Sequence, residues 1–127
     1  MTDPHIQWIE QAEYDLAAAG DMLKAGRLYY VLFCCQQAAE KMLKAIYVRK
    51  LNNVPPRTHQ LVRIAEETKL ELSEEHKNFL RELSAYYIQS RYPDEMENTE
   101  DDVSVDLAAQ VLRCTEELIK WLRSTIQ

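Results

Sequence analysis

The segment around Arg91 carries side chains that could hold a phosphate and a nucleobase. Residues 86–94 read Tyr-Tyr-Ile-Gln-Ser-Arg-Tyr-Pro-Asp, which places tyrosines on both sides of one arginine. A guanidinium group can bind a phosphate through paired hydrogen bonds, and an aromatic ring can stack on a base. We therefore take Arg91, with Tyr87, Tyr92 and Asp94 beside it, as candidate ligand-binding residues. In the alternative interpretation, Arg91 pairs with Asp94 and the acids that follow, and only clamps a helix end.

The chain carries a formal net charge of −6, but its charges are segregated along the sequence. One segment holds acids and no base: Asp94, Glu95, Glu97, Glu100, Asp101 and Asp102. Another segment holds bases and no acid: Lys41, Lys44, Arg49, Lys50, Arg57 and Arg63. Local potential governs the association of a charged ligand, so Lys41 and His59 in the basic segment are further candidate ligand-binding residues. The alternative is that these cations only complement a helix C-terminus or face solvent.

Other site chemistries find no support in the sequence. Di-iron bundles use Glu-x-x-His pairs, and no glutamate stands three residues before His5, His59 or His76. The adjacent Cys34 and Cys35 lack the spacing of zinc ligands, and thiols in so apolar a stretch usually pack in a core. Two isolated glycines exclude a Gly-rich phosphate loop. We expect no catalytic residue, no metal and no cofactor.

Length and composition indicate a single soluble domain over residues 1–127. The chain is 46% hydrophobic and 28% charged, which is typical of a folded globular protein. No apolar run is long enough to cross a membrane, and the first residues lack the pattern of a signal peptide. Three cysteines, two of them adjacent, favour free thiols. We expect a cytoplasmic protein with neither a membrane nor DNA as partner.

The elements that must position these residues are helices. Only two glycines and four prolines occur, too few for the many tight turns of an all-β domain. The expected helices are residues 4–25, residues 28–51, a short helix capped by Thr58, a helix capped by Ser73, and residues 103–126. Asp3 and Gly26 should cap the first helix, and Pro93 should end the fourth. The sequence therefore predicts an all-α, up-and-down bundle of four or five helices.

The helix expected at 28–51 changes character along its length. Its first part, residues 28–35, is apolar on nearly all sides, which indicates burial in the bundle or in a homodimer interface. Its second part is amphipathic, and the side chains expected to face solvent are Gln37, Glu40, Lys41 and Lys44. The other side should face the core, and it consists of Ala38, Ala39, Met42, Leu43 and Ile46.

Three motifs in this order and spacing resemble HEPN domains, the higher eukaryotes and prokaryotes nucleotide-binding family. They are Gln-Gln-Ala-Ala-Glu-Lys-Met-Leu-Lys-Ala at 36–45, Thr-His-Gln-Leu at 58–61 and Ser-Arg-Tyr-Pro-Asp at 90–94. The resemblance covers essentially the whole chain. It implies an all-α bundle that commonly forms homodimers. It also implies genetic pairing with a minimal nucleotidyltransferase, often as a toxin–antitoxin-like couple.

Many members of that family are metal-independent ribonucleases with an Arg-x4-6-His motif. Arg91 matches the arginine of this motif, but the positions open to its histidine hold Met96, Glu97 and Asn98. Arginine stays protonated and cannot act as a base, and the six acids after Arg91 would repel an RNA backbone. We therefore expect a non-catalytic, nucleotide-binding or accessory subunit of a nucleotidyltransferase pair. The alternative is a metal-independent ribonuclease toxin that uses Arg91.

Overall fold

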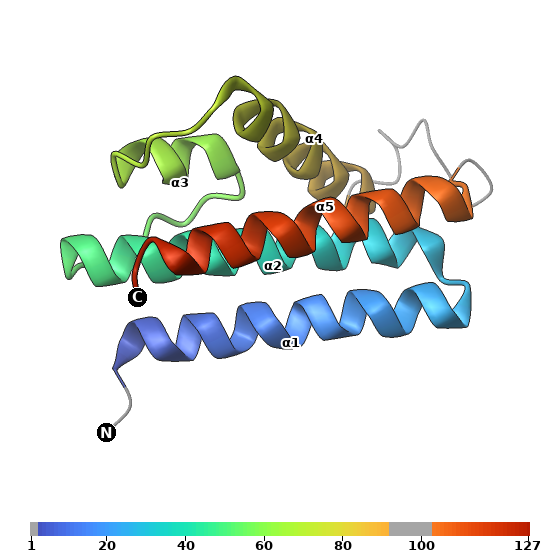
Figure 1. Cartoon of the computed structure of the whole chain (residues 1–127), viewed down its shortest axis with the longest axis horizontal. Coiled ribbons are helices and arrows are strands. Elements are labelled where there is room, and N and C mark those ends of the chain that lie inside the picture. Colours follow the sequence, from blue (N-terminus) through green and yellow to red (C-terminus); the bar gives the residue numbers. More distant parts are fainter. Residues whose placement is uncertain (1–2, 92–102) are drawn as a thin grey trace.

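The computed structural model describes residues 3–91 and 103–127, with the side chains of 88–91 left out. Its helices are α1 (Pro4–Ala25), α2 (Leu28–Leu51), α3 (Leu61–Glu67), α4 (Glu74–Arg91) and α5 (Val105–Ser124) (Figure 1). The described part of the chain contains no strand. The predicted all-α helical bundle is confirmed, and the bounds expected for the first two helices match α1 and α2.

The helices lie in three layers with α2 in the middle. Figure 1 shows α1 on one side, α2 and α5 between, and α3 with α4 on the other side. Helix α2 contacts each of the other four helices. Both ends of the described chain lie at the same end of the bundle as the C-terminus of α2 (Figure 1). A side chain on almost any face of α2 therefore meets another element.

The turn between α1 and α2 depends on Gly26. This residue has φ +76°, in the left-handed region that favours glycine. The N–H of Gly26 donates to the carbonyl of Leu23 at 3.1 Å, and the N–H of Arg27 donates to that of Met22 at 2.9 Å. These bonds satisfy carbonyls that the helix leaves free, so the predicted stop at Gly26 is confirmed. At the other end Asp3 precedes Pro4 as expected, although its side chain makes no capping bond.

Two serines start α4 and α5, whereas α3 starts differently from the prediction. Ser73 Oγ accepts from the N–H of His76 at 3.1 Å, and Ser104 Oγ accepts from that of Leu107 at 3.0 Å. The predicted cap by Ser73 is confirmed. The predicted cap by Thr58 is wrong, because α3 begins only at Leu61. Packing against α4 replaces that cap, as described below for Ser84.

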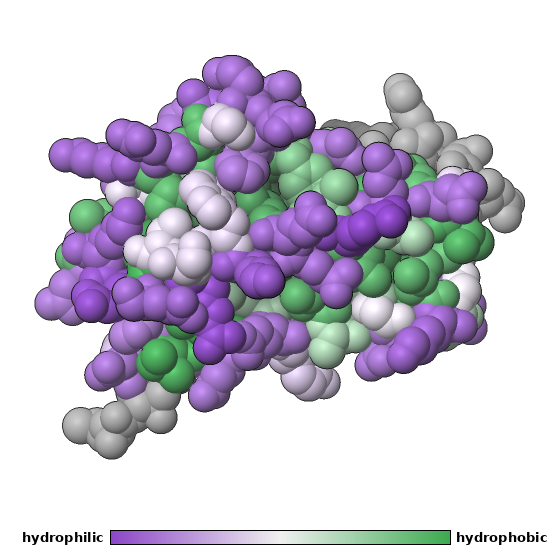
Figure 2. All heavy atoms as spheres, in the orientation of Figure 1, coloured by the Kyte–Doolittle hydropathy of each residue, from purple (hydrophilic) through white to green (hydrophobic). Residues whose placement is uncertain are grey.

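The core runs along α2 and collects apolar residues from all five helices. Fully buried side chains include Met42, Leu43, Ile46, Leu61, Ile64, Leu80, Leu83 and Leu122. Hydrophilic residues cover most of the face in Figure 2, with an apolar area toward the end that holds the α1–α2 turn. Within residues 3–91 and 103–127, no helix combines the length and the hydropathy needed to span a bilayer.

Candidate functional site

A row of polar side chains is buried on α2, inside the bundle. Gln36 is completely buried, and Glu40 and Lys44 are 5% and 8% exposed. The prediction that Glu40 and Lys44 face solvent is therefore wrong. The reason is the central position of α2, since the side that looks free in an isolated amphipathic helix is covered by α1 and by the segment before α3. The Lys44 ammonium lies 5.6 Å from the centre of the Trp8 ring of α1.

These polar groups hold one another through short contacts. Glu40 Oε2 accepts from Lys44 Nζ at 3.0 Å, and Glu40 Oε1 accepts from Gln36 Nε2 at 3.0 Å. Gln36 Oε1 in turn accepts from Gln37 Nε2 at 2.6 Å. A buried carboxylate is stable only when it is paired and hydrogen-bonded, and Glu40 meets both conditions.

The third partner of Glu40 is His59, which lies in the connection between α2 and α3. Its Nδ1 is 2.7 Å from Glu40 Oε1. The His59 side chain is 48% exposed, whereas that of Glu40 is only 6% exposed. The pair therefore connects the interior of the bundle to its surface. Sequence reasoning named His59 and missed Glu40, although glutamine, glutamate and lysine at four-residue spacing in a largely apolar helix were a signal for it.

The imidazole of His59 stacks on the ring of Tyr87 in α4. The two ring centroids are 3.8 Å apart and the planes differ by 21°. Tyr87 also stacks on Phe33 of α2, at 6.1 Å and 24°. This stack of three rings brings α2, α4 and the segment before α3 together. Two of the predicted site residues, His59 and Tyr87, therefore lie against each other in the fold.

Ser84 fixes the backbone next to this stack. Its Oγ accepts from the N–H of Leu61 at 3.1 Å and donates to the carbonyl of His59 at 3.4 Å. The first N–H groups of a helix need acceptors, so this serine serves as a cap from a neighbouring helix. It thereby holds His59 against α4 and replaces the cap that Thr58 was expected to provide.

Of the other predicted site residues, Lys41 is described by the structure and does not join this cluster. Lys41 Nζ lies 2.6 Å from Asp15 Oδ2 and ties α2 to α1. Arg91 is the last residue of α4, four positions after Tyr87, and its side chain lies outside the described residues. Tyr92 and Asp94 also lie outside them. The ligand-binding role of all these residues stays a prediction.

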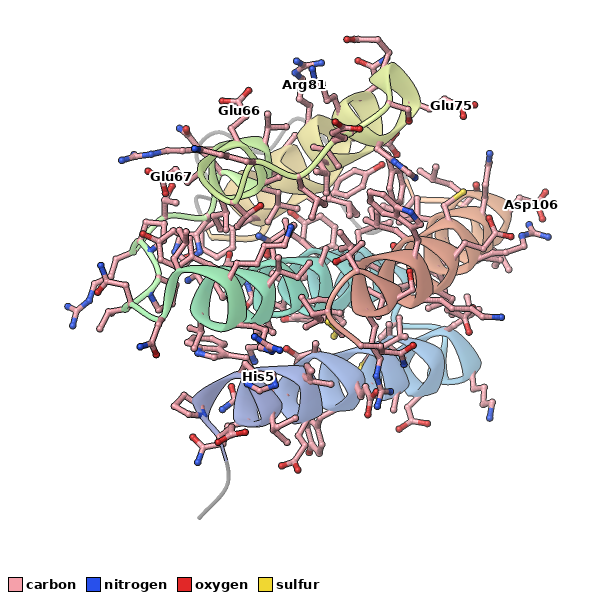
Figure 3. The ribbon with its side chains drawn as sticks, turned by 60° about the vertical axis from the view of Figure 1, so that its left-hand side comes forward. His5, Glu66, Glu67, Glu75, Arg81 and Asp106 are labelled. Carbon is pink, nitrogen blue, oxygen red and sulfur yellow. The ribbon has the colours of Figure 1, made fainter. Side chains whose placement is uncertain are left out.

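A shallow groove of about 440 Å³ lies between α3 and α4, beside His59. Its charged lining residues are Arg63, Glu66 and Arg81. Glu66 and Arg81 project from the two helices on the side away from α1 (Figure 3). Charges of both signs therefore line this groove. Among the described residues, no three His, Cys, Asp or Glu side chains gather in a way that could hold a metal ion.

The cysteines of α2 have the properties of packing residues. All three cysteines of the chain are free, and Cys35 is completely buried. Burial raises the pKa of the Cys35 thiol to about 12, and burial also raises the pKa of Cys34. A thiol acts as a nucleophile only as the thiolate, so these shifts oppose nucleophilic chemistry.

Comparisons with known proteins agree with the fold. A HEPN domain family model matches residues 6–125. A crystal structure of TT1696 from Thermus thermophilus is similar with a TM-score of 0.84 and 22% identity, covering 97% of this chain and 98% of that one. The archaeal HEPN homologue ST0689 is similar with a TM-score of 0.81 and 23% identity over 100% of both chains. No curated protein matches significantly. With nearly its full length matched, this chain belongs to the HEPN domain family.

Proposed function

We propose that this HEPN domain binds a nucleotide at the C-terminal end of α4 and serves as a non-catalytic accessory subunit of a small nucleotidyltransferase. The observation that carries the proposal is the half-exposed His59 ring, which Glu40 holds against Tyr87 one helical turn before Arg91. Residues four apart in a helix lie on the same face, so the arginine follows the ring stack along α4. An aromatic platform beside a guanidinium group suits a base and its phosphate.

Calorimetry with a panel of nucleoside mono-, di- and triphosphates tests the nucleotide site. Loss of a charged hydrogen-bonding group should weaken binding about tenfold or more in Arg91→Ala. The matched control is Arg113→Ala, which removes an exposed arginine of α5 and should leave binding unchanged. Absence of binding by the unaltered protein, or equal loss in both variants, would contradict the nucleotide site.

Metal-independent RNA cleavage is a second candidate function, and the position of His59 favours it. The motif positions 96–98 hold no histidine, yet His59 brings an imidazole to the ring that precedes Arg91 by one turn. Imidazole can transfer protons near neutral pH, which arginine cannot do. Incubation of RNA with the protein in the presence of a chelator should give cleavage that both His59→Phe and Arg91→Ala abolish. Intact RNA after prolonged incubation would exclude this candidate.

A homodimer is the expected assembly, through the first turns of α2. Tyr30 in this region is 55% exposed, and the neighbouring Tyr29 and Phe33 are only partly buried. Such aromatic side chains are enriched at interfaces. Sedimentation at micromolar concentration should give a dimer that Tyr30→Glu converts to a monomer. A monomeric mass for the unaltered protein would contradict the homodimer.

The nucleotidyltransferase partnership needs its own test. We expect a small nucleotidyltransferase to be encoded in the neighbouring reading frame and to co-purify with this chain after co-expression. The acidic segment at 94–102 and the exposed cations of the basic segment offer charge for such a contact, and added salt should then weaken the complex. These exposed cations are Arg49, Lys50, Arg57 and Arg63. Separate elution of the two proteins at low salt would contradict the partnership.

A further inference from the structure

We propose that Glu40 is a positioning residue that keeps the proton of His59 on Nδ1, so that Nε2 accepts a hydrogen bond from a ribose hydroxyl of the bound nucleotide. This inference rests on the proposed function, because it specifies how the same site would recognise its ligand. It adds Glu40, a buried residue, to that site. It also predicts that the site prefers ribonucleotides to deoxyribonucleotides.

The contacts of Glu40 determine which nitrogen of His59 carries the proton. Glu40 faces the Lys44 ammonium through Oε2 and the Gln36 amide through Oε1, and both of these groups are donors. An ionised carboxylate has no proton to donate and can only accept. The His59 Nδ1, 2.7 Å from Oε1, must therefore be the donor. In a neutral imidazole the other nitrogen, Nε2, is then an acceptor.

The surroundings of the ring keep Nε2 available and in a fixed orientation. Tyr87 covers one face of the ring at 3.8 Å, and Ser84 holds the backbone carbonyl of His59. Within the described part of the chain, Nε2 has no hydrogen-bond partner, and nearly half of the side chain is exposed. A hydrogen bond from one ring nitrogen to an interior carboxylate is the arrangement by which proteins fix a histidine tautomer.

The charge around His59 makes hydroxyl recognition more suitable than phosphate recognition at this nitrogen. The negative charge of Glu40 is balanced by Lys44 at 3.0 Å, and both charges are buried. A neutral ring that presents an acceptor repels a phosphate oxygen and attracts an O–H donor. Arg91 would hold the phosphate, while His59 would take the sugar. The 2′-hydroxyl is the group that distinguishes a ribonucleotide from its deoxy form.

Nitrogen-15 NMR of the histidine ring tests the role of Glu40 without any ligand. Under mildly alkaline conditions the unaltered protein should show His59 with its proton on Nδ1. Two variants that share Lys44→Met remove the buried charges and differ only at position 40. Glu40→Gln/Lys44→Met keeps an acceptor oxygen and should keep this tautomer, whereas Glu40→Met/Lys44→Met should lose it. Circular dichroism verifies that both variants are folded, and a proton on Nε2 in the unaltered protein would overturn the inference.

Calorimetry with adenosine monophosphate and 2′-deoxyadenosine monophosphate tests the role of Nε2. The unaltered protein should bind the ribonucleotide about tenfold more tightly, which corresponds to one hydrogen bond. His59→Phe preserves a ring that can stack on Tyr87, but it should abolish this preference. His76→Phe is the matched control, because His76 also stacks on an aromatic ring, that of Trp121 at 4.4 Å, and lies at the other end of α4.

The two experiments separate failure of the inference from failure of the proposed function. Binding of both nucleotides with equal affinity would overturn hydroxyl recognition and leave the nucleotide site standing. Absence of any binding would overturn the nucleotide site and the ribose preference together, and the NMR result would then decide the role of Glu40 alone. A ribose preference that survives in His59→Phe would assign the recognition to another residue and overturn the inference.

Discussion

Nδ1 of His59 lies 2.7 Å from Oε1 of Glu40, although 19 positions separate the two residues in the chain. The contact joins a half-exposed ring to a carboxylate inside the bundle. That carboxylate is held in turn by Lys44 of the same helix. The half-exposed His59 ring is therefore linked through Glu40 to the buried ion pair with Lys44.

The buried pair of Glu40 and Lys44 should show strong coupling in stability. Glu40→Met leaves an ammonium group buried beside Trp8, and Lys44→Met leaves a carboxylate without its cation. Each single change should lower the free energy of unfolding by about 3–5 kcal/mol. The double variant Glu40→Met/Lys44→Met should be more stable than either single variant, because no unpaired charge remains. Urea denaturation of the four proteins measures the coupling, and additive losses would contradict it.

The two glycines should respond in opposite directions to alanine. Gly26 has φ +76°, so Gly26→Ala strains the backbone and should lower stability by about 1 kcal/mol. Gly20 lies inside α1, and a Cβ added there meets no atom within 4 Å. Gly20→Ala should raise stability by about 0.5–1 kcal/mol, because alanine is the better helix former. Thermal unfolding of both variants checks the pair, and a change of the same sign in both would refute it.

Cys35 should resist alkylation in the folded protein. Burial raises the pKa of its thiol from 9.0 to about 12, so little of the reactive thiolate forms at pH 9. Mass spectrometry after iodoacetamide treatment should find Cys114 modified before Cys35, and urea should remove the difference. Modification of Cys35 at the rate of Cys114 in the folded protein would show that the thiol is accessible.

The raised pKa of Cys35 should lower the stability of the folded protein at high pH. The unfolded chain releases the Cys35 proton near the ordinary pKa of 9.0, whereas the folded chain keeps it up to about pH 12. Between these values the unfolded state binds fewer protons, so the free energy of unfolding should fall by about 1.4 kcal/mol per pH unit from this group. The difference in stability between the unaltered protein and Cys35→Ala should therefore shrink as pH rises from 9. A constant difference would contradict the shift.

Ser104 should contribute measurably to the start of α5. Its Oγ accepts from the N–H of Leu107 at 3.0 Å, and removal of such a cap typically lowers stability by about 1 kcal/mol. Ser104→Ala should show this loss in urea denaturation. Ser104→Asp, which keeps an acceptor oxygen and adds charge at the positive end of the helix dipole, should restore it. Equal stability of all three proteins would show that the cap is dispensable.

Helix ends were predictable where a local signal sets them. Gly26 stops α1, and Ser73 starts α4 through a bond to the third N–H after it, so sequence alone located both. Thr58 carries the same kind of signal, but the helix start predicted from it is wrong. There the acceptor for the first N–H of α3 comes from Ser84, 23 positions further along the chain. A contact between residues so far apart in the sequence cannot be recognised from the local sequence pattern.

The sequence predicted two residues of the candidate site, but it did not predict how they are arranged or that Glu40 joins them. Tyr87 and His59 were named from their types and their place in the chain, and the structure stacks them. Glu40 was missed because its helix has an amphipathic pattern, which places it toward solvent when the helix is considered alone. Its burial comes from α1 and from the segment that carries His59, so only the tertiary structure decides it.

Ser84 and Tyr87 lie three positions apart on α4, and both contact His59 in the segment before α3. A shift of α4 along its own axis by one residue, about 1.5 Å, would break the hydrogen bond of the Ser84 hydroxyl and the stacking of the Tyr87 ring at the same time. The positions of residues 59–61 and of this half of α4 therefore depend on each other. His59 in turn contacts Glu40, so this end of α4 and the buried carboxylate are linked through one imidazole ring.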